Sequence, residues 1–211
     1  MSAYAEQEEL ERLKSWWKTY GGSLIAGIAL GLAILFGYRY WVDYRLTQRE
    51  AASVLYDQML DELRARKPEA SASGTKLIDE YASTPYAGMA ALLLARHAYE
   101  TGDKTGARQR LEWAIANVSD PATRHAARLR LARLLIEMGQ LPEAAALAEV
   151  KEIAGFESEY HELRGDLAVA QDKPEQAREA YSAALKQVPS GSPYRAVLSM
   201  KLDDLGGEKA Q

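Results

Sequence analysis

Three histidines are the side chains in this sequence that could most readily bind a metal ion or transfer a proton. His97, His125 and His161 are 28 and 36 residues apart, and none belongs to an HExxH motif. Histidine metal sites need short, regular ligand spacings, such as i and i+4 on one helix. We therefore expect exposed or packed histidines and no metal site; a metal-dependent enzyme that uses them is the alternative.

Other signatures of catalysis are missing from the sequence. The chain has no cysteine, which excludes a thiol nucleophile, a disulfide framework and thiolate metal sites. Its glycines form neither GxGxxG nor a P-loop, and no serine lies in a strand–turn–helix elbow. Solvated helix faces account for the many carboxylates. We predict that the protein is not an enzyme and uses no cofactor and no small-molecule substrate.

The charge balance gives no sign of a nucleic-acid partner. Lysine and arginine number 26 against 30 acidic residues, for a net charge of −4. Proteins that bind nucleic acid concentrate positive charge, which this chain does not. A hydrophobic content of 47% suffices for one compact domain with an additional segment.

The additional segment is an uncharged stretch of twenty residues, Thr19 to Tyr38. As a helix it would extend roughly 30 Å, the thickness of the hydrocarbon core of a bilayer. Aromatic side chains gather at headgroup level, and both ends of the stretch carry them. The interface anchors that we expect are Trp16, Trp17, Tyr38, Tyr40 and Trp41.

A buried core helix and a cleaved signal peptide are alternatives for this stretch. Core helices seldom run this long without charge. A signal peptide has a shorter apolar region and a small-residue cleavage site, whereas "GYRYW" follows here. We predict a retained transmembrane helix over residues 19–41, in contact with membrane lipid.

Small residues recur on two faces of that helix. Ser23, Gly27 and Gly31 are four residues apart, and a second row contains Ala29, Ala33 and Gly37. Such rows let two helix backbones approach closely in lipid, although glycine and alanine are also common in membrane helices generally. We predict helix packing at Ser23, Gly27 and Gly31, with a second copy or with another protein. Basic residues flank both ends almost equally, so charge leaves the orientation open.

The pattern of the remaining chain predicts helical hairpins. Neither Gly nor Pro occurs between Tyr38 and Lys67, so a helical stalk over 42–67 should include the first helix of the soluble domain. Turn residues then recur, and the alanines that open the second helices, Ala107, Ala144 and Ala177, are 37 and 33 residues apart. A period near 34 is that of the tetratricopeptide repeat. We predict an all-α fold in which the transmembrane helix precedes tetratricopeptide-like repeats (an α-solenoid) over 68–205; an ordinary helical bundle is the alternative.

First helices of such repeats line a concave surface that binds partners. In each unit, positions are counted from the small residue of the first helix, and this count (the register) shows which positions face the concave surface. The register predicts a partner groove with apolar residues and one arginine in each of two units. These residues are Met89, Leu92, Arg96, Tyr99, Leu129, Arg133 and Ile136, with the acidic Glu159, Glu162 and Asp166 in the next unit. Burial of several of them in the core is the alternative.

The layout resembles a known family. A single span ending in "GYRYW", a helix containing "REAASVLYDQM" and degenerate repeats closing in "YRAVLSMKLDDL" are similar to the YfgM family, ancillary subunits of the bacterial SecYEG translocon. The resemblance implies a single-pass protein of the inner (plasma) membrane, with the N-terminus in the cytoplasm and the repeats in the periplasm. It further implies association with SecYEG and with the periplasmic chaperone PpiD, in support of protein secretion.

These expectations divide the chain into five parts: a cytoplasmic N-terminus (1–18), the transmembrane helix (19–41), the stalk (42–67), the repeat domain (68–205) and a disordered tail (206–211). A membrane-anchored tetratricopeptide scaffold for cell-envelope assembly or division, with other partners, is the alternative function, because helical repeats serve many roles.

Overall fold

The computed structural model describes residues 2–65, 67, 70–151, 153 and 155–206, so all of the predicted tail except Gly206 lies outside the described residues. Every regular element among the described residues is a helix, which confirms the all-α prediction. The chain divides into two compact units, Met1–Ala51 and Ala52–Gln211. The helices are α1 (Ser2–Arg64), α2 (Ala70–Glu80), α3 (Pro85–Glu100), α4 (Lys104–Asn117), α5 (Pro121–Glu137), α6 (Leu141–Ala148), α7 (Glu157–Ala170), α8 (Pro174–Gln187) and α9 (Tyr194–Asp204).

The first unit is the N-terminal part of α1. Among the described residues α1 is the helix long and apolar enough to cross a bilayer. Its large apolar side chains are exposed; Phe36, for example, is 65% exposed. The rings of Tyr38 and Trp41 lie 6.2 Å apart, and the Arg45 guanidinium lies 4.9 Å from the Trp41 ring. Apart from the backbone of α1 itself, no atom of the described residues lies within 4 Å of a Cβ built at Gly27 or Gly31, so this face has room for a neighbouring helix.

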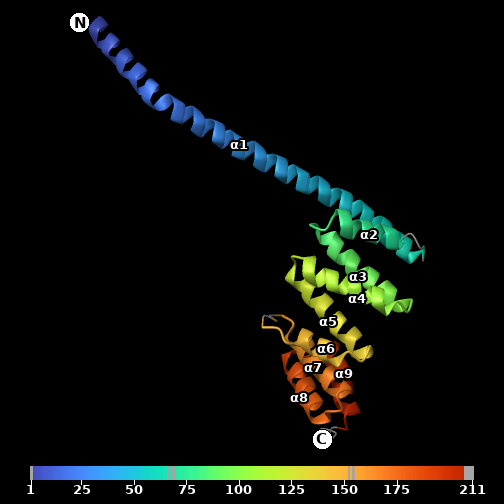
Figure 1. The fold of residues 1–211 in the computed structure, drawn as a ribbon. Coiled ribbons are helices and arrows are strands. Elements are labelled where there is room, and N and C mark those ends of the chain that lie inside the picture. The colour runs from blue at the N-terminus through green and yellow to red at the C-terminus, as the bar shows by residue number, and fades with distance from the viewer. Residues whose placement is uncertain (1, 66, 68–69, 152, 154, 207–211) are drawn as a thin grey trace. The chain divides into compact units, whose positions relative to one another are not determined.

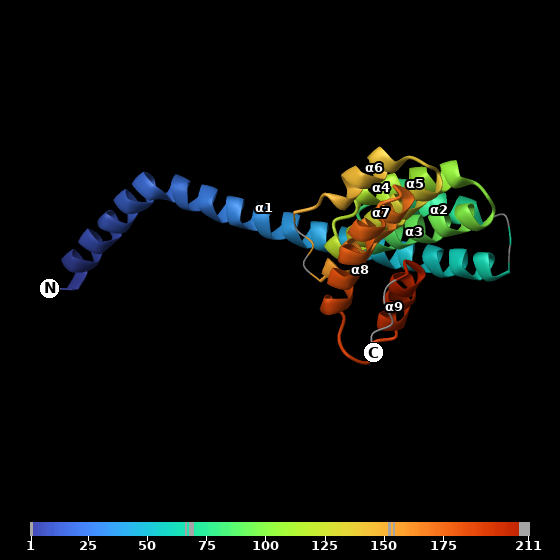
Figure 2. The same ribbon diagram turned by 90° about the horizontal axis from the view of Figure 1, so that it is seen from below.

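The second unit is a series of antiparallel helix pairs. Figures 1 and 2 show α3 paired with α4, α5 with α6, and α7 with α8, and α9 packs against α8 at the end of the series. The C-terminal turns of α1 form the first pair with α2, because Met59 and Leu77 share one core cluster. This arrangement confirms the predicted tetratricopeptide-like architecture.

Small residues allow the helices of each pair to touch. The alanines and the glycine that the repeat period places at contacts between paired helices are buried: Ala95, Ala107, Ala114, Ala132, Ala144, Gly165, Ala177 and Ala184. In the last full unit the packing is very close, because a Cβ added to Gly165 would overlap the ring of Tyr181. Gly165 of α7 therefore provides the space that the ring of Tyr181 on α8 occupies, four residues after Ala177.

The third unit departs from the repeat after Ala144. Its second helix, α6, ends at Ala148, and the following segment packs Val150, Ile153 and Phe156 against the cluster around Tyr160. Arg164 of α7 donates to the Ala148 carbonyl at 3.2 Å and so caps the end of this short helix.

Candidate partner-binding groove

Three of the seven predicted groove residues line one cavity. Arg96 and Tyr99 project from α3, and Arg133 projects from α5, into a cavity of about 290 Å³. The other lining residues come from α3, α4 and α5: Ala95, Ala107, Leu111, Arg130, Leu134 and Glu137. The first helices of the second and third units thus form the surface on which the register placed a groove, with α4 contributing to the floor.

The remaining predicted groove residues lie elsewhere. Met89 is exposed on α3 outside the cavity, whereas Leu92 and Ile136 are half-buried and pack against the main core cluster. Leu129 is only 4% exposed and packs with Ala132, Tyr160 and Leu163, so its assignment to a surface groove is corrected. The physical reason is that α5 packs against α4, α6 and α7, so its apolar residues are buried in contacts on several sides of the helix.

Glu137, the acidic residue of this cavity, is already paired. Its carboxylate forms a 2.7 Å ion pair with Lys104 Nζ and accepts a 2.8 Å hydrogen bond from the Tyr99 hydroxyl. The bond from Lys104 has the larger effect and the bond from Tyr99 the smaller, and together they hold the pKa of Glu137 below its usual value. The same bond to Glu137 raises the pKa of Tyr99. Arg96 is paired in the same way with Glu100, and Arg133 with Glu162, so Arg130 is the rim cation that has no ion pair with a described residue.

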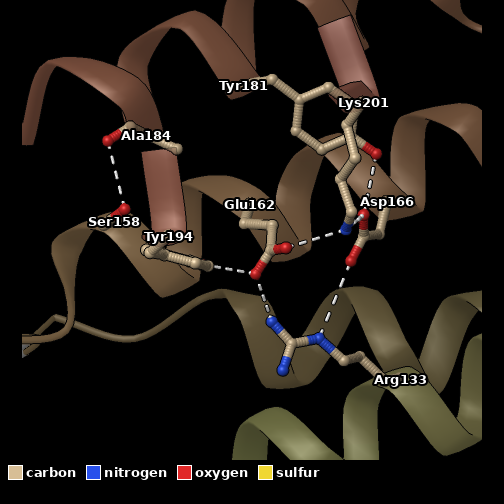
Figure 3. A network of polar contacts seen from close by, with 8 residues as sticks. All are labelled: Arg133, Ser158, Glu162, Asp166, Tyr181, Ala184, Tyr194 and Lys201. Carbon is tan, nitrogen blue, oxygen red and sulfur yellow. Dashed lines mark hydrogen bonds and ion pairs between the residues drawn. The ribbon is translucent and has the colours of Figure 1, made fainter. Parts of the chain in front are cut away.

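The acidic part of the predicted groove is closed by a polar network on α7 (Figure 3). The side chain of Glu162 is 5% exposed and accepts bonds from Arg133 Nη2 at 2.5 Å, the Tyr194 hydroxyl at 2.5 Å and Lys201 Nζ at 2.9 Å. Asp166 accepts from Lys201 Nζ at 2.5 Å and from the Tyr181 hydroxyl at 2.7 Å.

The network fixes the pKa values of its members. Burial by itself would raise the pKa of Glu162, but hydrogen bonds from Tyr194 and Lys201 and the charge of Arg133 outweigh burial and lower it. Burial, together with a bond to a carboxylate, raises the pKa of both Tyr181 and Tyr194. Both tyrosines therefore remain protonated donors at neutral pH, and both carboxylates have several partners.

The sequence reasoning identified Glu162 and Asp166 as groove-facing but missed Tyr194 and Lys201. These two residues are seven apart on α9 and therefore share one face, which is the signal that could have found them. Figure 3 shows Tyr194 and Lys201 on either side of Glu162, with Arg133 below the two α7 carboxylates. α9 thus covers Glu162 and Asp166, which the register predicted to face a partner.

Arg133 belongs to two cavities at once. Besides the first cavity, it lines a second one of about 540 Å³ with Glu159, Glu162, Ser192 and Tyr194. Its Nε also lies 3.7 Å from Asp166. The Arg133 side chain therefore lies between a cavity on α3, α4 and α5 and a second cavity bounded by α5, α7 and the start of α9.

The three histidines lie on three helices, α3, α5 and α7. His125 Nδ1 is 2.9 Å from the Tyr160 hydroxyl, and its ring lies 4.8 Å from the Phe156 ring. Burial, followed by the charges of Arg128 and Arg124, lowers the pKa of His125. Among the described residues no three metal-ligating side chains come together. The geometry of His125 is that of a packed aromatic side chain.

Comparison with known proteins extends over nearly the whole chain. A family model described as a tetratricopeptide repeat-like domain matches residues 14–207. A relative from Aggregatibacter actinomycetemcomitans is 30% identical, and the match covers 95% of this chain and 97% of the relative. A relative from Neisseria gonorrhoeae is 29% identical with the same coverage, and one from Escherichia coli is 26% identical over 95% of this chain and 96% of the relative. Each relative is named "Ancillary SecYEG translocon subunit".

Proposed function

Because this chain belongs to the tetratricopeptide repeat-like family of ancillary SecYEG translocon subunits, the YfgM family, we propose that it is a non-catalytic subunit of that translocon. The observation that carries the proposal is the agreement of the relatives' names over about 95% of the chain. The match includes both the apolar helix and the repeats, so the two parts are related as one protein. No comparable observation favours a scaffold for envelope assembly or division.

The apolar part of α1 is the proposed membrane anchor. Side chains such as Ile28 and Leu35 are 57% and 53% exposed, and an exposed apolar surface of this length is stable in lipid rather than in water. Residues 19–41 would span the inner membrane, with residues 1–18 in the cytoplasm and the repeat domain in the periplasm. Trp16, Trp17, Tyr38, Tyr40 and Trp41 would lie at the two interfaces.

Ser23, Gly27 and Gly31 are proposed to pack against a neighbouring membrane helix, of the translocon or of a second copy. The open space around Gly27 and Gly31 supports this proposal, because close approach of two helices needs the absence of side chains.

The groove on the repeat domain is the proposed contact surface for a periplasmic partner. Such a partner would be the chaperone PpiD or a secretory protein that emerges from the translocon. The cavity rimmed by Arg96, Tyr99 and Arg133 supports this role, because it combines an apolar floor with polar groups at its edge.

Co-purification tests the proposal. The full chain, carrying an affinity tag, is extracted in a mild detergent, and its partners are identified by mass spectrometry. We expect SecYEG to be recovered, and recovery of PpiD would support the chaperone contact. Recovery of envelope-assembly or division proteins without SecYEG would contradict the proposed function. As a control for the anchor, the chain should stay with vesicles that are washed in carbonate.

A further inference from the structure

The cavity between α3, α4 and α5 has a floor suited to an apolar side chain. Ala95, Ala107, Leu111 and Leu134 supply this floor. Its volume of about 290 Å³ is just below the range for ligand pockets, about 300–1,000 Å³. The cavity therefore accommodates one or two side chains of a partner and not a large cofactor.

The rim of the cavity carries one positive charge without an ion-pair partner among the described residues, that of Arg130. The other charged groups of the rim are paired. Glu137 is neutralised by Lys104 at 2.7 Å. Arg96 is bonded to Glu100 at 2.7 Å, and Arg133 to Glu162 at 2.5 Å. Arg130 is exposed and makes no ion pair with any residue that the structure describes.

We propose that this cavity binds a leucine-like side chain flanked by carboxylates in a partner polypeptide. The proposal deepens the proposed function, on which it rests, by naming the chemistry of the segment that the groove takes. The apolar side chain would displace water from the floor, and the flanking carboxylates would lie against Arg130 and the outer edges of Arg96 and Arg133. Guanidinium–carboxylate bonds are charge-assisted and directional, so they set the register of the bound segment.

Peptide binding to the full chain in neutral detergent micelles tests the proposal. The probes are fluorescein-labelled Gly/Ser peptides that carry Asp-Leu-Glu, Lys-Leu-Lys or Asp-Ser-Glu at the centre, and fluorescence anisotropy gives the dissociation constants. We expect the Asp-Leu-Glu peptide to bind at least about tenfold more tightly than either of the others. Equal binding of the three peptides would overturn the proposal.

A pair of matched variants locates the binding. Arg130→Glu reverses a charge on the rim and should weaken binding of the Asp-Leu-Glu peptide about tenfold. Arg124→Glu makes the same change at an exposed position of α5 outside the cavity and should leave binding unchanged. Both residues are exposed, so both variants should keep the helical circular dichroism of the parent. Equal losses, or no loss in Arg130→Glu, would show that the cavity is not the site.

The proposed function and this inference fail in different ways. Recovery of SecYEG with the tagged chain, together with peptides that bind alike, would overturn the cavity proposal and leave the translocon role intact. Discrimination among the peptides without recovery of SecYEG would have the opposite meaning.

Discussion

Glu162 shows how far the chemistry of one residue can depend on distant parts of the sequence. Its carboxylate is bonded to Arg133, Tyr194 and Lys201, which are 29, 32 and 39 positions away. The repeat register could place Glu162 on the inner face of α7, but it contains no information on which donors would reach that face. Those donors depend on where α9 packs, which is a tertiary property.

Replacing Glu162 by glutamine tests the network. Glu162→Gln keeps the shape of the side chain but removes the charge that three donors share, so the free energy of unfolding should fall by about 2 kcal/mol at neutral pH. Because the bonds lower the pKa of Glu162 in the folded state, its stabilisation is complete above the ordinary value of 4.5 and is lost as the pH falls further. Urea denaturation of the full chain in micelles, at neutral pH and below pH 4.5, measures the difference, which should shrink in acid.

Glu159→Gln provides the matched control for this measurement. Glu159 lies on the same helix and lines the second cavity, but it accepts no ion pair from the described residues. Its substitution should change the free energy of unfolding by less than about 0.5 kcal/mol. Equal effects of the two substitutions would show that the network contributes no specific stability.

Gly165 provides a second test at the scale of single residues. Alanine is the better helix former by about 1 kcal/mol, so Gly165→Ala would stabilise an exposed helix. Here the added methyl group would overlap the Tyr181 ring, and overpacking costs about 1–3 kcal/mol. We expect a lower midpoint of thermal unfolding by circular dichroism. In a Tyr181→Leu background the cost should largely disappear, and an undiminished cost there would rule out the ring as its cause.

At the scale of the helices, three first helices end in the same way. Gly102, Gly139 and Asp172 each have a positive φ, of 87°, 74° and 56°. The next residue in each unit donates its backbone N–H to a carbonyl of the last turn, as Lys173 does to Ala168 at 2.9 Å. This is the Schellman ending, which favours glycine because the left-handed region has no cost for it.

The fourth unit has Asp172 where the other two units have Gly102 and Gly139. The stability of variants at this position should therefore follow a defined order. Asp172→Gly should raise the free energy of unfolding by about 0.5–1 kcal/mol, and Asp172→Ala should lower it, because alanine adopts a positive φ less readily than aspartate. Gly139→Asp should destabilise the third unit by a similar amount. Thermal unfolding of the variants measures the order Gly, Asp, Ala, and any other order would contradict this account of the helix ending.

The helical pairs were predictable from the sequence because their signals are local. Turn residues and buried alanines recur near the repeat period, and the structure places the pairs where these signals indicated. The groove was predictable only in part, since Arg96, Tyr99 and Arg133 line the cavity whereas Leu129 is in the core. A repeat register gives the inner face of an ideal unit. It does not reveal that α6 is short, or how the segment that follows it repacks α5 and α7.

At the scale of the whole molecule, the two units differ in how far their apolar side chains are buried. The described residues from Ala52 to Gly206 bury small and large apolar side chains in their own core clusters. The apolar part of α1 has no such cover among the described residues, and its leucines and isoleucines are exposed. Hydropathy and length predicted this difference, because both are properties of a contiguous stretch. The direction in which the stretch crosses a membrane depends on flanking charge, which is nearly balanced here.

Cysteine labelling tests the proposed orientation, because the chain has no native cysteine and each introduced thiol is unique. Ser15 precedes the apolar stretch and Ser190 lies in the turn before α9, and both are exposed. In spheroplasts, a membrane-impermeant maleimide should label Ser190→Cys, since the repeats would face the periplasm, and should leave Ser15→Cys unlabelled until the membrane is permeabilised. Labelling of both variants after permeabilisation shows that each thiol is reactive. The reverse pattern in intact spheroplasts would place the repeats in the cytoplasm, where neither PpiD nor a chain leaving the translocon could reach the groove.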